Sequence, residues 1–322
     1  METRTLSHTD LTVSRACFGT MTFGGQTDAA TAARMVDLCL DRGINFFDTA
    51  NSYVKGESEK ILGGILKGRR EKVVLATKVG TPTGDPADAS PLSRKSILHD
   101  IDTSLRRLQT DYLDLYYLHL PDYEAPIEET LAAMDEVVRA GKVRHPAISN
   151  YAAWQHCEIL WLSEKRGYQA PYVAQPMYNL LARGIEQEYL PFCGRFGVST
   201  VVYNPLAGGL LTGKQHRERP LPGTRFDNNQ MYLDRYWHPA YFDAVDQLRP
   251  VAEKAGRPLL DLSFNWLLNH TQTDVVILGA SKYEQLEQAL DVFGKAALDA
   301  ETVAAFDRVW QGLRGVTPKY NR

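Results

Sequence analysis

The chain has 322 residues and a mass of 36.2 kDa, which suits one large α/β barrel or two smaller domains. Hydrophobic residues make up 44% of the chain and charged residues 23%, close to ordinary globular usage, so a disordered or fibrous protein is excluded. There are 36 basic and 39 acidic residues, giving a formal net charge of −3, so the composition offers no basic field for nucleic acid or an acidic membrane.

The N-terminus shows no apolar segment following positive charge, and no run of about 18 apolar residues occurs anywhere. We therefore expect a soluble, unexported, cytoplasmic protein. The four cysteines lie far apart without a Cys-x-x-Cys pair, and the histidines contain no His-Glu-x-x-His, so we expect reduced thiols and no metal site. The cysteines are Cys17, Cys39, Cys157 and Cys193.

The chain begins with a predicted hairpin and continues as strands alternating with helices. Residues 3–6 and 11–14 flank a turn-like His-Thr-Asp and predict a hairpin that could plug one end of a barrel. Short apolar runs follow, each leading into a segment of helical periodicity. We interpret these runs as eight parallel strands at residues 16–19, 44–48, 73–77, 113–118, 143–148, 172–174, 200–203 and 275–278.

The predicted helices carry ordinary start and stop signals. Asp28 can cap a helix that ends at Gly43, and Ser93 can cap another helix. The apolar face of the second helix is Ile97, Ile101, Leu105 and Leu108. Eightfold alternation, with no Gly-x-Gly-x-x-Gly after the first strand, favours a (β/α)₈ TIM barrel over a doubly wound sheet. Without any linker, we expect a single domain over residues 1–322.

The longest irregular stretch covers residues 204–239 and is rich in Gly, Pro, Asn and Arg. A loop of this length inside a compact domain is usually functional. It follows the seventh predicted strand, on the face where barrel enzymes hold their active sites.

Four polar residues stand just past successive predicted strands: Asp48, Tyr53, Lys78 and His119. In a barrel they would converge at one rim. A phenol with a pKa of about 10 is a poor acid or base at neutral pH unless a cation stabilises its anion, and Lys78 could supply that charge. Asp48 could hold the ammonium, and a neutral His119 could donate a hydrogen bond to an oxygen that gains negative charge. Together these groups could protonate a carbonyl oxygen.

Each residue also has an ordinary structural interpretation. An Asp after a strand is usually a helix cap, a Lys there is usually solvated, and a Tyr or His there usually packs against neighbours. The placement of all four at matched strand ends favours the catalytic interpretation.

Several segments, taken in order, resemble the aldo-keto reductase superfamily over nearly the whole chain. They are GINFFDTA at 43–50, Tyr53, GESE at 56–59, ATK at 76–78, LHLPD at 118–122 and GKVR at 141–144. Within the superfamily the chain is most similar to the aflatoxin aldehyde reductase branch, through ISNYAAW at 148–154, YNPLAGGLLTGK at 203–214, RYW at 235–237 and YNR at 320–322. The resemblance implies that Tyr53 is the proton donor, assisted by Lys78, Asp48 and His119.

The resemblance further implies an extended nicotinamide dinucleotide across this rim. Ser149, Asn150 and Gln175 offer hydroxyl and amide groups for the carboxamide, and Tyr203 could stack on the nicotinamide. From the residues alone, Asn150 could equally be a turn residue and Tyr203 a core residue. The expected cofactor contacts are Ser149, Asn150, Gln175, Tyr203, Asn204, Leu206, Gly208, Lys214, Arg225, Gly279, Ser281 and Gln285.

The phosphate end of the cofactor is implied by the same resemblance. It places Lys214 and Arg225 against the phosphates, and residues 279–282 open the last barrel helix, whose N-terminus suits a phosphate. Ser281 and Gln285 match contacts to the 2′-phosphate region. Because no acidic residue is obviously placed to hold a free ribose diol, we expect NADPH, with NADH as a weaker alternative.

Two positions depart from the family pattern. Ala289 stands where the family usually has Asn, so one adenine hydrogen bond is missing. The His145-Pro146 pair stands where the family often has a Gly, and proline removes a ladder donor at the start of the predicted strand.

On the substrate side, Met21, Tyr53 and His119 would wall the pocket. The branch places guanidinium groups near substrate oxygens at positions matching Arg235 and Arg322, and a guanidinium suits a carboxylate. The expected substrates are small carbonyl compounds: semialdehydes, dicarbonyls or aromatic aldehydes. Apart from the resemblance, an Arg at a terminus is more often solvated. The branch also suggests a homodimer.

Two competing functions stay open from the sequence. One is a nucleotide-binding regulatory subunit of the potassium channel β-subunit type, which resembles the same superfamily. The other is a sugar-isomerising barrel that binds no nucleotide. Consumption of NADPH with aldehydes separates catalysis from regulation, and NADPH binding excludes the isomerase.

Overall fold

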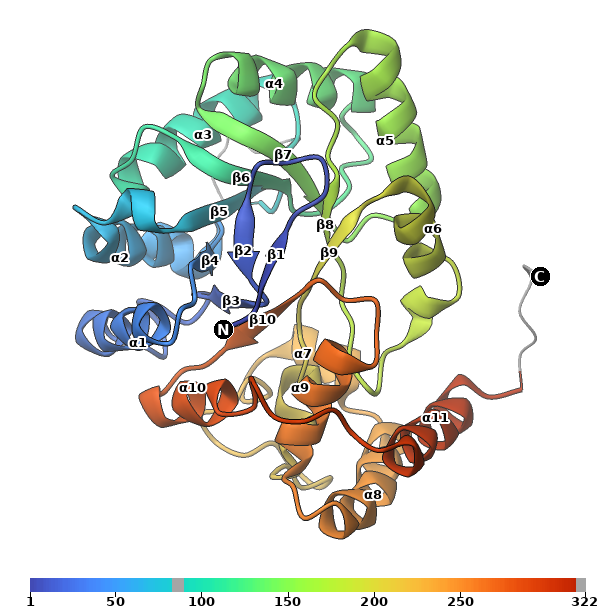
Figure 1. The fold of residues 1–322 in the computed structure, drawn as a ribbon. Coiled ribbons are helices and arrows are strands. Elements are labelled where there is room, and N and C mark those ends of the chain that lie inside the picture. The colour runs from blue at the N-terminus through green and yellow to red at the C-terminus, as the bar shows by residue number, and fades with distance from the viewer. Residues whose placement is uncertain (83–89, 317–322) are drawn as a thin grey trace.

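The computed structural model describes residues 1–82 and 90–316. Within these residues, eight parallel strands close into a barrel in the order β10-β3-β4-β5-β6-β7-β8-β9, with the helices outside (Figure 1). The strands are β3 (Ala16–Gly19), β4 (Phe46–Asp48), β5 (Val74–Val79), β6 (Leu113–Leu118), β7 (Val143–Ser149), β8 (Val173–Gln175), β9 (Ser199–Val202) and β10 (Val275–Gly279). The predicted (β/α)₈ barrel is confirmed.

Several helices begin at a residue whose side chain caps them. Asp28 accepts a hydrogen bond from the amide of Thr31 at the start of α1, and Ser93 accepts one from Ser96 at the start of α3. The helices are α1 (Ala29–Asp41), α2 (Glu57–Leu66), α3 (Arg94–Leu108), α4 (Ile127–Arg139), α5 (Ala153–Arg166), α6 (Tyr189–Phe196), α7 (Gln230–Tyr236), α8 (Pro239–Lys254), α9 (Leu259–Asn269), α10 (Tyr283–Leu290) and α11 (Ala300–Arg314). None of them is long and apolar enough to cross a membrane, among the residues described.

An antiparallel hairpin of β1 (Thr3–Thr5) and β2 (Thr12–Ser14) covers the amino-terminal end of the barrel (Figure 1). Its side chains Leu6, Leu11 and Val13 are buried in one apolar cluster with residues of the barrel strands, such as Phe46 and Leu115. Strand residues alternate between this cluster and the one beneath the helices, because successive side chains point to opposite faces. The hairpin therefore plugs the barrel, as predicted.

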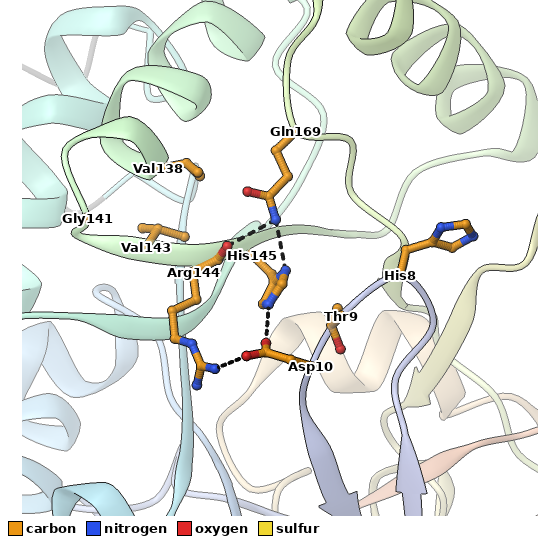
Figure 2. A pocket seen from close by; sticks show the side chains of 9 residues that line it. All are labelled: His8, Thr9, Asp10, Val138, Gly141, Val143, Arg144, His145 and Gln169. Carbon is orange, nitrogen blue, oxygen red and sulfur yellow. Dashed lines mark hydrogen bonds and ion pairs between the residues drawn. The ribbon is translucent and has the colours of Figure 1, made fainter.

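Polar contacts tie the turn of this hairpin to β7 (Figure 2). Asp10 accepts a hydrogen bond from Arg144 at 2.5 Å and bonds the His145 ring at 2.8 Å. The other ring nitrogen of His145 lies 2.8 Å from the side-chain amide of Gln169. His145 therefore serves to fasten the plug.

Two local expectations need correction. Residues 204–239 are not wholly irregular: they contain a 3₁₀ segment, Ala207–Thr212, and α7, because buried Phe226, Tyr232 and Tyr236 give the segment its own core. Pro146 lies in the middle of β7, paired with Tyr116 of β6, and not at the start of the strand.

The cysteines carry no disulfide. Cys17, Cys39 and Cys193 are buried, and Cys157 is exposed on α5.

Candidate active site

The side chain of Lys78 lies at the centre of the carboxyl-terminal mouth of the barrel. It is fully buried, 0% exposed. Its ammonium donates to a carboxylate oxygen of Asp48, to the Thr49 carbonyl at 2.8 Å and to the Tyr53 hydroxyl at 3.3 Å. These acceptors match the three protons of an ammonium, so its position is fixed. The second carboxylate oxygen of Asp48 accepts a bond from Gln175 at 2.9 Å.

Burial and the ion pair together set the charge states. Burial by itself lowers the pKa of Lys78, but the Asp48 carboxylate and Tyr53 raise it above its ordinary value, so the ammonium keeps its charge. Burial raises the pKa of Tyr53, while the Lys78 charge lowers it. Burial outweighs the cation, so the pKa of Tyr53 lies above its ordinary value and the phenol keeps its proton at neutral pH.

Tyr53 is followed by a short left-handed turn. Val54 and Lys55 have φ of 47° and 54°, and Gly56 has φ of 88°. A β-branched residue at positive φ is strained, and such strain persists only where the surroundings impose it. Here the guanidinium of Arg107 on α3 packs against Gly56, where an added Cβ would lie 2.4 Å from its Cζ. Arg107 also donates to the Asn51 carbonyl at 3.2 Å.

A buried carboxylate completes this support. Glu59 is 0% exposed and accepts from Arg107 at 3.1 Å and from Thr77 at 2.7 Å. Asn51 in turn donates to Asp100 on α3 at 2.8 Å. No sequence pattern predicted a role for Arg107, Asn51 or Asp100. Glu59 lies in the GESE segment at 56–59, through which the chain resembles the superfamily. The support fixes the backbone on which Tyr53 stands.

His119 follows β6 and faces Tyr53. Its backbone amide donates to the Val79 carbonyl at 2.7 Å, and its ring meets the Tyr53 ring edge-on with centroids 5.9 Å apart. Thr81, also unassigned by the sequence, bonds Nδ1 of His119 at 2.9 Å. Burial, aided by the Lys78 charge, lowers the pKa of His119 to about 3, so the ring is neutral at physiological pH. The structure therefore brings Asp48, Tyr53, Lys78 and His119 together.

The polar residues after β7 and β8 form one hydrogen-bonded chain at the same rim. Ser149 donates to the Gln175 carbonyl at 2.9 Å, and Asn150, at φ of 65°, donates to the His119 carbonyl at 2.9 Å. The hydroxyl of Tyr203 donates to the Asn150 side chain at 2.7 Å. These bonds fix the orientation of the Tyr203 ring beside the mouth.

The loop after β9 begins with another left-handed Asn. Asn204, at φ of 62°, accepts from the amide of Gly208 at 2.9 Å and donates to the Tyr236 hydroxyl at 3.1 Å. Leu206 is half-buried against the core. A Cβ at Gly208 would lie 2.9 Å from the Tyr232 ring, so the close approach requires glycine.

Of the expected phosphate-binding residues, Arg225, Gly279, Ser281 and Gln285 lie around the end of β10. Arg225 donates to the Tyr232 hydroxyl at 2.6 Å, and a Cβ added at Gly279 would lie 3.2 Å from its Nη2. Ser281 donates from both its amide and its hydroxyl to Gln285, at 3.1 and 3.2 Å. Lys214 is exposed. A guanidinium, an ammonium and a helix N-terminus form a donor set that fits a phosphate group.

The expected substrate residues lie nearby, with one exception. Met21 is half-buried, with its sulfur 3.9 Å from Nη1 of Arg225. Arg235 stands over the Tyr232 ring at 5.7 Å, and its charge opposes the rise that burial causes in the pKa of Tyr203. Arg322 lies outside the described residues.

Comparison with known proteins finds one matching family model and relatives that cover most of the chain. The model of the aldo/keto reductase family matches residues 15–311. The chain is 38% identical to mouse aflatoxin B1 aldehyde reductase member 2 over 94% of its own length and 86% of the relative. It is 37% identical to human aldo-keto reductase family 7 member A3, over 94% of its own length and 96% of the relative. It is also 34% identical to a probable voltage-gated potassium channel subunit beta of Arabidopsis thaliana, over 91% of its own length and 92% of the relative.

Proposed function

The chain belongs to the aldo/keto reductase family, and from this premise we propose that it reduces small aldehydes to alcohols with NADPH, with Tyr53 as the proton donor. The observation that carries the proposal is the buried Lys78, whose ammonium bonds Asp48 and Tyr53 at once. A carbonyl that accepts a hydride needs a proton on its oxygen, and a positioned acid that keeps its own proton at neutral pH can supply it.

Tyr53 loses its proton in this reaction and becomes a phenolate. Its pKa lies above the ordinary value, so the proton is present when substrate arrives. The Lys78 ammonium, 3.3 Å away, stabilises the phenolate that remains. Asp48 keeps the ammonium in place and charged.

His119 acts as a neutral hydrogen-bond donor to the same carbonyl oxygen. An imidazole whose pKa is about 3 carries a single proton at neutral pH and cannot act as a cation there. One of its nitrogens can still donate to an oxygen that gains negative charge, in a site with little water.

The rim formed by the carboxyl ends of β7, β8, β9 and β10 and the segments after them would hold the dinucleotide. The nicotinamide, when bound, supplies the hydride. The amide and hydroxyl groups of Ser149, Asn150 and Gln175 suit the carboxamide, and the fixed ring of Tyr203 offers a stacking face. For the phosphates we assign Lys214, Arg225, Gly279, Ser281 and Gln285, together with the loop residues Asn204, Leu206 and Gly208. This basic set supports NADPH over NADH.

Ala289 is buried on α10, so its small side chain offers no hydrogen bond to an adenine. Binding of the adenine would then depend on other groups.

On the substrate side, Arg235 supports aldehydes that carry a carboxylate. It stands on α7 near Tyr203 and the mouth, where its two parallel donors could hold both carboxylate oxygens. Semialdehydes are therefore our first substrate class, with dicarbonyls and aromatic aldehydes next.

One experiment tests the proposal. NADPH consumption is measured with matched aldehydes that do or do not carry a carboxylate, for wild type, Tyr53→Phe and Arg235→Ala. We expect Tyr53→Phe to bind NADPH normally and to lose about 10²- to 10⁴-fold in turnover. Arg235→Ala should raise KM for the carboxylated aldehyde alone. Full activity in Tyr53→Phe would refute the role of Tyr53.

The second candidate function is a nucleotide-binding regulatory subunit. The similarity to a probable potassium channel subunit beta favours it. A protein that binds NADPH tightly but turns over none of the aldehydes would support this alternative over the reductase.

A further inference from the structure

Within residues 1–82 and 90–316, the ring of His119 is hydrogen-bonded at one nitrogen. Nδ1 lies 2.9 Å from the hydroxyl oxygen of Thr81, a half-buried residue that follows β5. Among the described residues, no side chain or backbone group bonds Nε2. In the part of the chain that the structure describes, the two nitrogens therefore differ: Nδ1 contacts a protein hydroxyl, and Nε2 has no protein partner.

The rest of His119 is fixed independently of Thr81. Its amide donates to the Val79 carbonyl at 2.7 Å, its carbonyl accepts from Asn150 at 2.9 Å, and its ring packs edge-on against Tyr53. Removal of the Thr81 hydroxyl should leave the ring in place. What it would change is which nitrogen carries the proton.

That choice decides what the ring can do. A neutral imidazole has one N–H donor and one bare nitrogen acceptor. If Nε2 carries the proton, the ring can donate to a carbonyl oxygen in the mouth. If Nδ1 carries it, Nε2 presents a lone pair to that oxygen, which repels the developing negative charge.

We propose that Thr81 is a positioning residue whose hydroxyl donates to Nδ1 of His119 and so keeps the proton on Nε2. The inference rests on the proposed function, because it assumes that Nε2–H meets the substrate oxygen. A threonine hydroxyl can donate or accept; in the donating arrangement Nδ1 is its acceptor and carries no proton, and this is the arrangement that the test below reads.

The backbone places Thr81 for this contact. Gly80 has φ of 108°, and a Cβ added there would lie 2.7 Å from the Leu92 side chain. A glycine therefore lets the chain turn past Leu92 directly after β5 and present the next residue to the ring. The positive φ and the close approach of Leu92 explain the glycine at position 80.

The test compares Thr81→Val, which has nearly the same shape without the hydroxyl, with Thr81→Ser, which keeps the hydroxyl. Long-range proton–nitrogen NMR on protein with ¹⁵N-labelled histidine reads the tautomer directly, and His119→Gln assigns the signal. We expect the Nε2–H form in wild type and Thr81→Ser, and a mixture or the Nδ1–H form in Thr81→Val.

Kinetics supply the second readout. In Thr81→Val we expect kcat to fall about tenfold, less than the 10²- to 10³-fold typical of deleting an oxyanion donor, with KM for NADPH unchanged. Thr81→Ser should recover most of the loss. Circular dichroism and unfolding midpoints check that all variants fold.

The outcomes separate this inference from the proposed function. An Nδ1–H tautomer in wild type, an unchanged tautomer in Thr81→Val, or no rescue by Thr81→Ser would each overturn the role of Thr81. If wild type consumed no NADPH with any aldehyde, the proposed function would fail, and with it only the catalytic consequence of the Thr81 contact. The tautomer would then still show separately whether Thr81 donates to His119.

Discussion

Polar side chains are arranged differently at the two ends of the barrel. At the amino-terminal end, a hollow lies between the hairpin turn and β7, and its polar side chains pair with one another: Asp10 with Arg144 and His145, and His145 with Gln169 (Figure 2). At the carboxyl-terminal mouth a buried ion pair lies beside the Tyr53 hydroxyl, and among the described residues one nitrogen of His119 has no partner. We therefore base the candidate site on the buried charge beside hydrogen-bond donors and not on the hollow.

Backbone strain is distributed in the same unequal way. Most non-glycine residues with positive φ follow the carboxyl ends of the barrel strands, while the hairpin contributes only His8 among the described residues. Those at the mouth are Val54, Lys55, Asn150, Asn204 and Ala207. Strained residues persist where the surroundings hold them, and here they position side chains at the mouth.

The largest effect should come from Lys78→Met. Turnover should fall by at least about 10²-fold because the phenolate of Tyr53 loses its cation. The free energy of unfolding should also fall by about 3–5 kcal/mol, since Asp48 stays buried without its partner. Steady-state kinetics and urea unfolding measure the two losses.

A matched control is Lys60→Met, which breaks an exposed ion pair with Glu57. Its stability should change by less than about 1 kcal/mol, with turnover intact. Equal stability losses in the two variants would contradict the distinction between buried and exposed pairs.

Next in size is Leu11→Ala in the plug. Leu11 is 2% exposed inside the barrel cluster, so its truncation should cost about 2–5 kcal/mol of unfolding free energy. Because the plug lies at the opposite end from Tyr53, kcat and KM should stay at wild-type values at a temperature where the variant is folded. A large fall in kcat with the fold intact would show that the two ends are coupled.

The smallest effect should come from Asp10→Asn. This change should lower the free energy of unfolding by about 1 kcal/mol or less, because Asp10 is 66% exposed and water screens its bonds. The bond to His145 lowers the pKa of Asp10, so its contribution is fully present above the ordinary Asp value of 3.8 and is lost as pH falls through the lower folded-state value.

Urea unfolding of wild type and Asp10→Asn at neutral pH and near pH 3 measures this difference. The gap between the two proteins should shrink at the lower pH. A gap that grows on acidification would have the wrong sign for this bond.

Much of the fold could be read from local patterns. The eight apolar runs coincide with the barrel strands to within a few residues, because a buried strand needs a short apolar run wherever it lies in the barrel. Asp28 and Ser93 were identifiable as caps for an equally local reason. The 204–239 segment was harder, since Tyr232 and Tyr236 form only one helically spaced pair on the short helix α7, and buried Phe226 lies outside that helix.

The sequence by itself determined the barrel, the plug and the four polar residues at strand ends, because hydrophobic alternation and the order of strands are written locally along the chain. The tertiary structure alone decided that burial outweighs Lys78 in the pKa of Tyr53, that Arg107 and Glu59 hold the turn after Tyr53, and that Thr81 meets His119. Such contacts join residues about 25 to 50 positions apart, and burial depends on all the elements packed around a group, so neither can be read from any single stretch of sequence.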